Sequence, residues 1–144
     1  MRIVQISLFL ENKPGTLAAA TKLLYEAGIN IRALSIAEAG EFGVVRLVVD
    51  DAERCYEVLR AAGFTVSKTE VIGVEMDDRP GALFEIADTL GRASININYA
   101  YAFSKGGGRA ILIMSVDFVE RAIEVLRAAG AKLVGVEALM QSGA

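Results

Sequence analysis

The hydrophobic pattern changes its period in a fixed order along the first part of the chain. From residue 4 to 10 every second residue is apolar, which is typical of a strand with one buried face. A Pro-Gly pair at positions 14–15 interrupts this strand. Apolar residues then recur every three or four positions from Leu17 to Ala27, which predicts a helix that ends at Gly28.

A hairpin, a second helix and a last strand complete the pattern. Residues 29–38 and 42–49 are rich in β-branched and other apolar residues and are separated by Ala-Gly-Glu, which predicts a hairpin. Residues 51–62 return to helical spacing, and Gly63 marks their end. Residues 64–69 again favour a strand. The predicted order of elements is βαββαβ.

Both halves of the chain carry this pattern. ENKPGTLAAATKLLYEAGINI recurs 66 residues later as DDRPGALFEIADTLGRASINI, and VLRAAG at 58–63 recurs 67 residues later at 125–130. We place the one extra residue of the second copy in the loop KGGGR, because a glycine-rich turn tolerates an insertion. The chain is therefore predicted to hold two units, residues 1–69 and residues 70–144.

Each βαββαβ unit is expected to form a four-stranded antiparallel sheet with both helices on one face. This is the ferredoxin-like arrangement of the α+β class. The single Cys55 lies on the apolar stripe of the second helix, so we expect it in the core. Tyr99, Tyr101 and Phe103 alternate along one strand face and either line a pocket or pack in a core or interface. Residues 106–108, Gly-Gly-Gly, are expected to form a flexible turn.

Composition excludes several classes of function. The chain has 144 residues, 53% of them hydrophobic and 23% charged, with a formal charge of -3 and a pI near 5.0. The sequence lacks the clusters of Lys and Arg that bind the phosphates of nucleic acid. No apolar run approaches the roughly 20 residues needed to span a bilayer. Histidine is absent and cysteine occurs once, so we expect no metal site, no cofactor and no catalytic residue. A single cysteine cannot form a disulfide within the chain, so we expect the protein in the reducing cytoplasm.

Other functions of ferredoxin-like units fit poorly. RNA recognition needs aromatic side chains on the central strands, whereas VVRLVV and AILIMSV are aliphatic. A metal chaperone needs paired cysteines in the first loop, and a nucleoside diphosphate kinase needs a histidine. Acylphosphatase-type chemistry needs an arginine in that loop, and Arg79 of the second copy is replaced by Lys13 in the first.

The phrase L-E-N-K-P-G followed by G-I-N-I resembles the ACT domain over essentially the whole chain, twice. ACT domains are amino-acid-sensing units attached to many metabolic enzymes, including phosphoglycerate dehydrogenase. The resemblance implies a free amino acid where the first loop of one unit meets the second strand of its partner unit. It also implies a metabolic enzyme or a second copy of the chain as partner. The implied ligand-binding residues are Leu10, Glu11, Asn12, Pro14, Gly15 and Asn30 in the first copy, and Met76, Asp77, Asp78, Pro80, Gly81 and Asn96 in the second.

The physics of the first loop suits an α-amino acid. A helix N-terminus offers unpaired N–H groups to a carboxylate, and Gly15 leaves room for a ligand to approach the backbone. The Asn12 amide can accept a hydrogen bond from an ammonium group and still donate elsewhere. Asp78 replaces this amide by a charge in the second copy. We therefore favour a site that pairs Asn12 with Asn96 over one that pairs Asp78 with Asn30.

Three functional classes remain open from the sequence. The favoured one is a non-catalytic sensor of a free amino acid that regulates amino-acid metabolism. The second is a small enzyme whose cleft at the same loops uses carboxylates or Lys13. The third is a structural partner subunit without a small ligand, in which Pro-Gly and the strand-start asparagines only shape turns.

Overall fold

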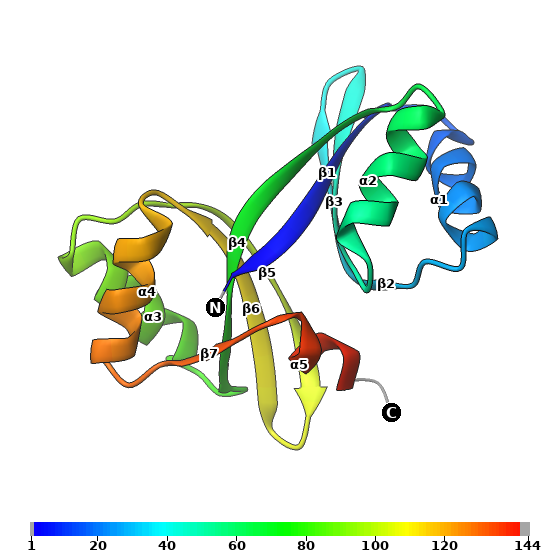
Figure 1. Ribbon diagram of the computed structural model, residues 1–144. Helices are drawn as coiled ribbons and strands as arrows, with labels where there is room; N and C mark the ends of the chain where they lie inside the picture. The colour runs from blue at the N-terminus through cyan, green and yellow to red at the C-terminus, as the bar shows by residue number, and fades with distance from the viewer. Residues whose placement is uncertain (1, 142–144) are drawn as a thin grey trace. The chain divides into compact units, whose positions relative to one another are not determined.

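The computed structural model describes residues 2–141, which fold into two compact units (Figure 1). The N-terminal unit comprises Val4–Thr69, and the C-terminal unit comprises residues 70–141 together with residues 2–3. Within residues 2–141 no helix is long and apolar enough to cross a membrane.

The N-terminal unit has the predicted βαββαβ order. Its elements are β1 (Ile3–Glu11), α1 (Thr16–Glu26), β2 (Ile31–Ala39), β3 (Phe42–Val49), α2 (Ala52–Ala61) and the first residues of β4 (Thr65–Asp77). The strand order is β2–β3–β1–β4, and the β1–β3 and β2–β3 pairs are antiparallel. Gly28 and Gly63 follow the two helices with φ of 72° and 89°, the left-handed conformation expected of glycine at a helix end.

The C-terminal unit repeats this order with one addition. Its elements are the later residues of β4, α3 (Ala82–Arg92), β5 (Ile97–Gly106), β6 (Arg109–Val116), α4 (Val119–Ala128), β7 (Lys132–Val134) and α5 (Val136–Gln141). Antiparallel pairing gives the strand order β7–β4–β6–β5. Helix α5 was not predicted, and β4 is one continuous strand that serves both units in turn.

Helices α1 and α2 lie on one face of the sheet of the N-terminal unit, and α3 and α4 lie on one face of the sheet of the C-terminal unit, as predicted (Figure 1). The core of each unit fills the space between these layers. The largest fully buried side chains there are Ile6, Leu8, Leu24, Leu47 and Leu59 in one core, and Ile72, Leu90, Met114 and Leu126 in the other. Cys55 is fully buried in the first of these cores, which confirms its predicted place.

The extra residue of the second copy does not enlarge the hairpin loop. Ser104 pairs with Ala110 and Gly106 pairs with Arg109, so Lys105 forms a β-bulge inside β5. Only Gly107 and Gly108 remain between β5 and β6. The insertion therefore lies within KGGGR, as predicted, but it forms a bulge in the strand and keeps the two-residue turn.

The aromatic residues of β5 lie on the sheet face that points away from the helices. Tyr101 and Phe103 pair with Ile113 and Ile111, whereas the intervening Leu112 belongs to the helix-facing core. Because paired residues of antiparallel strands share a face, Tyr101 and Phe103 are outside that core. Both are half-buried.

Candidate functional site

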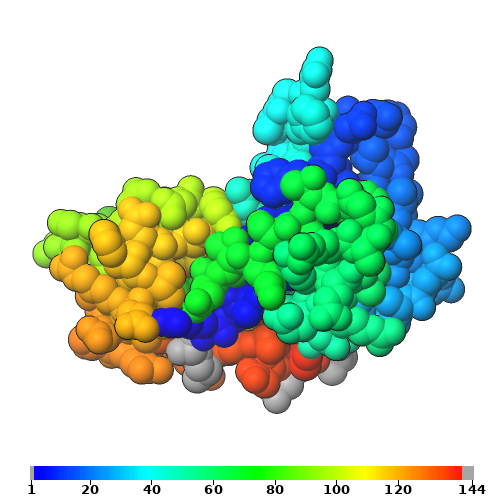
Figure 2. Space-filling view, turned by 45° about the horizontal axis from the view of Figure 1, so that its top comes forward, coloured from blue at the N-terminus to red at the C-terminus, as the bar shows by residue number. Residues whose placement is uncertain are grey.

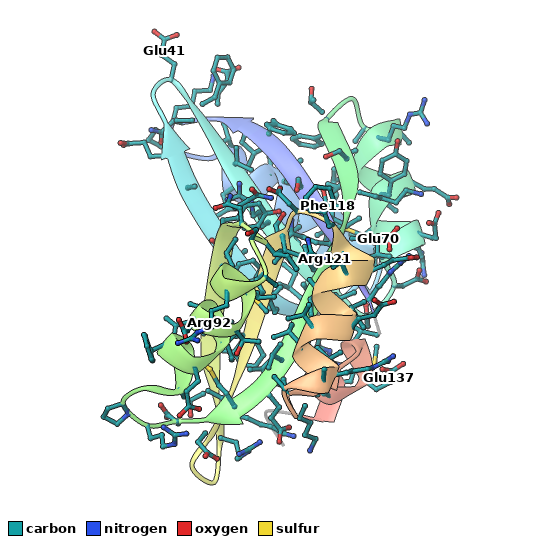
Figure 3. The ribbon with its side chains drawn as sticks, turned by 90° about the vertical axis from the view of Figure 1, so that its left-hand side faces the viewer. Glu41, Glu70, Arg92, Phe118, Arg121 and Glu137 are labelled. Atoms are coloured by element: carbon teal, nitrogen blue, oxygen red, sulfur yellow. The ribbon has the colours of Figure 1, made fainter. Side chains whose placement is uncertain are left out.

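The loop between β1 and α1 is fastened to the tip of the β2–β3 hairpin. The backbone N–H of Asn12 donates to the carbonyl oxygen of Glu41 at 2.7 Å, and Asn12 Nδ2 donates to that of Gly40 at 3.1 Å. This tip, cyan in Figure 2, projects from the N-terminal unit, and the Glu41 side chain points outward from it in Figure 3. Within the described chain, no donor reaches the Oδ1 acceptor of Asn12.

Helix α1 begins without a side-chain cap. Gly15 precedes it with φ of 91°, a conformation that strains any residue with a Cβ, and its first turn has no acidic residue. The Thr16 hydroxyl donates back to the carbonyl oxygens of Glu11 and Lys13, at 2.8 and 3.1 Å. Among the described residues, the N–H groups at positions 16–18 meet no acceptor. This helix end can therefore hold an anion.

The corresponding loop of the C-terminal unit is already filled with charge. The Arg79 guanidinium donates to both carboxylate oxygens of Glu85, each at 3.0 Å, and to Asp77 at 3.3 Å. Glu85 lies in the first turn of α3, where α1 has Ala19. The Asp78 N–H keeps the backbone hydrogen bond to the hairpin, to the carbonyl oxygen of Gly108 at 2.8 Å, but Asp78 lacks the amide N–H₂ group with which Asn12 makes its second bond. The two copies thus share a loop shape and differ in chemistry.

The strand-start asparagines lie at the other end of each sheet from the loop of the same unit. Glu11 pairs with Phe42 at the start of β3, and Ile31 pairs with Val49 at its end. The eight-residue strand β3 therefore separates Asn30 from its own loop. The same topology separates Asn96 from the first loop of the C-terminal unit. The pairing of each asparagine with the loop of the other unit stays a prediction.

The strand-start asparagines also make local hydrogen bonds. The Asn30 N–H donates to the Asp50 carboxylate at 3.1 Å. Asn96 Nδ2 donates to Asn98 Oδ1 at 3.0 Å, and Asn98 Nδ2 donates to Asp117 at 3.3 Å. These bonds order the start of each second strand, which is the structural role expected of such residues in turns.

A pocket of about 340 Å³ opens beside the first loop of the N-terminal unit, and we call it the N-terminal pocket. It extends from the end of β1 to the first turn of α1 and to the start of β4. Its lining is Phe9, Leu10, Glu11, Thr16, Ala19, Phe42, Gly63, Phe64 and Thr65. Phe9 and Phe42 are 43% and 55% exposed, so the mouth of this pocket is apolar.

A second pocket, of about 250 Å³, occupies the same place in the C-terminal unit, and we call it the C-terminal pocket. Its floor is apolar and its rim is charged. The floor includes Val74, Ala82, Ile86 and Leu126, and the charged residues are Glu75, Asp77, Arg79, Glu85, Arg109 and Lys132. The charges of this rim distinguish it from the aromatic mouth of the N-terminal pocket.

Glu75 is the centre of a charged cluster beside the C-terminal pocket, on the sheet face that points away from the helices, because it pairs with Ile111. Its side chain is only 5% exposed, and it receives Lys105 Nζ at 2.7 Å, Arg109 Nε at 3.1 Å and Lys132 Nζ at 3.1 Å. The hydrogen bond from Lys105 contributes most to holding the pKa of Glu75 at about 2, although burial opposes this shift. Arg109 also donates to Asp77, which links the cluster to the first loop.

Two nucleophiles considered from the sequence are engaged or buried. Lys13 Nζ pairs with the Glu11 carboxylate at 3.1 Å, and both side chains are largely exposed. Burial, with smaller contributions from Asp51 and Asp50, raises the pKa of the Cys55 thiol to about 11. Cys55 is therefore held as the thiol, which is a poor nucleophile.

A family model described as the ACT domain pair matches residues 1–142. The chain belongs to the ACT domain pair family. The predicted family and the tandem ferredoxin-like fold are thereby confirmed. ACT domains are regulatory units, and each copy of the repeated phrase spans the first loop, the first helix and the start of the second strand of one ACT unit.

Solved structures show the same fold. The structure of protein BT0572 from Bacteroides thetaiotaomicron is 33% identical, covers 98% of this chain and 97% of its own, and has a TM-score of 0.92. The regulatory subunit of aspartate kinase from Thermus thermophilus, in its ligand-free form, is 17% identical with coverages of 88% and 91% and a TM-score of 0.65. Its counterpart from Thermus flavus is 18% identical, with coverages of 96% and 91% and a TM-score of 0.62. The search of curated proteins finds no match.

The pockets of this ACT domain pair include only part of the predicted site. Leu10, Glu11, Met76 and Asp77 line them, whereas the remaining loop residues lie outside both linings: Asn12, Pro14, Gly15, Asp78, Pro80 and Gly81. The charged residues Arg109 and Lys132 were missed. A comparison of the two copies of the repeat reveals both residues, because the equivalent positions of the first copy are Phe42 and Thr65.

Proposed function

We propose that this ACT domain pair is a non-catalytic regulatory protein of the cytoplasm that binds a free amino acid at the first loop of its N-terminal unit. The observation that carries the proposal is the uncapped start of α1. Its first-turn N–H groups meet no acceptor among the described residues, and no acidic side chain stands in that turn. A ligand carboxylate would satisfy these donors and interact favourably with the helix dipole.

Asn12 supports the same proposal from the other side of the loop. Its amide nitrogen is held by Gly40, which fixes the plane of the amide and leaves Oδ1 as an acceptor for an ammonium group. Carboxylate and ammonium together are what every free α-amino acid presents. The side chain of the ligand would lie in the adjoining N-terminal pocket, because Thr16 and Ala19 belong both to the first turn of α1 and to its lining.

The C-terminal loop is the weaker candidate for this binding mode. A carboxylate at the start of α3 would meet Glu85, and Asp78 would repel it further. Arg79 already neutralises Glu85 through two hydrogen bonds, so it is not free to receive a ligand in the same way. We therefore place the proposed amino-acid site at Leu10, Glu11, Asn12, Pro14 and Gly15.

The partner that responds to the ligand is proposed to be an enzyme of amino-acid metabolism or a second copy of the chain. The family supports a regulatory role. The aspartate kinase regulatory subunits share the fold at 17% and 18% identity. This similarity supports the fold alone, so the partner has to be identified by experiment.

The variant Asn12→Ala tests the proposal by calorimetric titration with the amino acid that binds the native protein most tightly. Loss of one hydrogen bond to a charged ligand group costs about 1.5–3 kcal/mol, which lowers the affinity about tenfold to hundredfold. Asp78→Ala is the matched control at the equivalent position and should leave the affinity unchanged. Equal effects of the two variants would show that the first loop of the N-terminal unit is not the site.

A further inference from the structure

Strand β2 forms one edge of the sheet of the N-terminal unit. Among the described residues it pairs with β3 alone, so no further strand lies along its outer side. Natural sheets usually protect an edge with charged residues, proline or a β-bulge. The register shift of β2 lies at its start, between Ile31 and Ala33, and residues 33–37 contain neither proline nor a charged residue. The middle of this edge is therefore open to pairing with another strand.

Two large apolar side chains are exposed along β2. Leu34 pairs with Leu47 of β3. Ile36 pairs with Val45, and both partners belong to the core between the sheet and the helices. Because paired residues share a face, Leu34 and Ile36 lie on the face that the helices cover, yet they are 43% and 54% exposed. The helices therefore leave this edge uncovered, and a strand beside β2 would bury part of both side chains.

The order of side chains along β2 is complementary to itself. Arg32 stands two positions before Leu34, and Glu38 stands two positions after Ile36. Two β2 strands can pair antiparallel with the two copies of Ser35 opposite each other. Arg32 of each strand then faces Glu38 of the other, and the two apolar residues face each other. A pair centred on Leu34 would place Arg32 opposite Ile36, and one centred on Ile36 would place Glu38 opposite Leu34. The register centred on Ser35 therefore matches opposite charges and matches apolar residues.

Arg32 has an unsatisfied donor. Its Nε atom is buried, and it is the one buried side-chain polar atom of the described residues without a hydrogen-bond partner. A buried donor without an acceptor is costly, because it has lost its hydrogen bonds to water and gained none. A carboxylate beside this guanidinium would offset that cost. Glu38 is exposed and can supply the carboxylate to a second copy of the chain.

The second copy of the repeat lacks this pattern. The four equivalent positions of β5 hold small or uncharged residues: Asn98, Ala100, Ala102 and Ser104. Strand β5 also has a register shift near each end, which makes its edge less suited to pairing. A sheet edge that only faced solvent would not need the charged and apolar residues of β2. The difference between the copies therefore indicates a role for the β2 edge that the β5 edge does not share.

We propose that β2 is a self-association surface, through which the N-terminal units of two chains pair antiparallel about Ser35 into one continuous sheet. Arg32 of each chain forms an ion pair with Glu38 of the other, and Leu34 packs against Ile36. Both chains use the same surface, so the interface is two-fold symmetric and closes as a dimer. The inference rests on the proposed function for its regulatory meaning, because it selects a second copy of the chain among the partners named there. The pairing itself requires no amino acid.

Charge exchange tests the pairing by sedimentation equilibrium of the full chain without ligand. The native chain should form dimers. Arg32→Glu and Glu38→Arg each replace two attractive pairs by two repulsive ones, so each should weaken dimerisation about tenfold or more. The double variant should dimerise like the native chain, and so should an equimolar mixture of the two single variants, because opposite charges then face each other again. Ser104→Arg, at the position of β5 equivalent to Glu38, is the matched control and should leave the dissociation constant unchanged.

A cysteine at the centre of the pair tests the register. Ser35→Cys should form a disulfide between two chains under oxidation by copper phenanthroline, because the two introduced thiols face each other. Ala37→Cys lies on the same face of β2, and its two copies would be about 13 Å apart in this register, so it should remain unlinked. The native Cys55 is buried and does not compete.

The inference is wrong if the native chain sediments as a monomer, if both single variants associate like the native chain, or if neither the double variant nor the mixture regains association. Cross-linking of Ala37→Cys in place of Ser35→Cys would also contradict it. The titration with amino acids is independent of these outcomes. A monomer that binds an amino acid would contradict this inference alone, and a dimer that binds none would contradict the proposed function alone.

Discussion

Replacement of Glu75 by glutamine should destabilise the protein far more than the loss of an ordinary ion pair. Interactions with Lys105, Arg109 and Lys132 hold the Glu75 pKa at about 2, against an ordinary value of 4.5. A shift of this size corresponds to about 3 kcal/mol of favourable interaction with the charged form. Glutamine keeps one acceptor oxygen but removes the negative charge, so we expect a loss of about 2–3 kcal/mol in the free energy of unfolding at pH 7.

The pH dependence has a definite sign. Because the pKa of Glu75 is lower in the folded protein, its contribution is complete above the unfolded value near 4.5 and is lost as the pH falls towards 2. The native protein should therefore lose more stability than Glu75→Gln across this interval. Urea unfolding followed by circular dichroism at several pH values measures both quantities.

The matched control is Glu53→Gln. Glu53 accepts a hydrogen bond from Lys68 at 2.9 Å, close to the distances at Glu75, but its side chain is 70% exposed. An exposed pair of this kind contributes about 0–1 kcal/mol. Equal destabilisation by Glu75→Gln and Glu53→Gln, or the same acid sensitivity with and without Glu75, would refute the account of the charged cluster.

Two further predictions concern the α2 region. Because burial raises the pKa of Cys55 to about 11, a thiol reagent at pH 8 should react with it only on unfolding, and rapid labelling of the native protein would contradict the assignment to the core. Asp51 caps α2 by accepting from the Arg54 N–H at 3.1 Å, so Asp51→Ala should cost about 1 kcal/mol in urea unfolding. Asp88→Ala, which removes only an exposed pair with Arg92, serves as its control and should have a smaller effect.

The elements that were predicted from the sequence depend on local patterns. The signals of these elements lie within a few residues of one another: alternation in β1, helical spacing in α1, and a glycine after α1, α2 and α4. The βαββαβ order and its repetition could therefore be predicted directly. Helix α5 was missed because its six residues are too few to set a period. The inserted residue was predicted within KGGGR, but its place in a β-bulge was missed because a bulge at Lys105 depends on strand register.

The candidate site was predictable only in part, because its residues come from separate elements. Leu10 and Met76 belong to the repeated phrase and line the pockets. Glu75, Arg109 and Lys132 lie on three different strands, and only the pairing of those strands brings them together. The spacing of these residues along the sequence does not show which strands pair. The sequence does show that the second copy differs from the first at these three positions. Such differences between copies indicate candidate functional residues in similar chains.

The central claim is that this ACT domain pair binds a free amino acid without converting it. The most direct measurement is the thermal unfolding of the native chain with each of the twenty amino acids, followed by mass spectrometry of the recovered ligand. A ligand at 100 times its dissociation constant stabilises the folded state by about 2.7 kcal/mol. The account predicts that at least one amino acid raises the unfolding temperature and is recovered unchanged. Twenty unchanged unfolding temperatures, or steady conversion of the amino acid that binds, would contradict it.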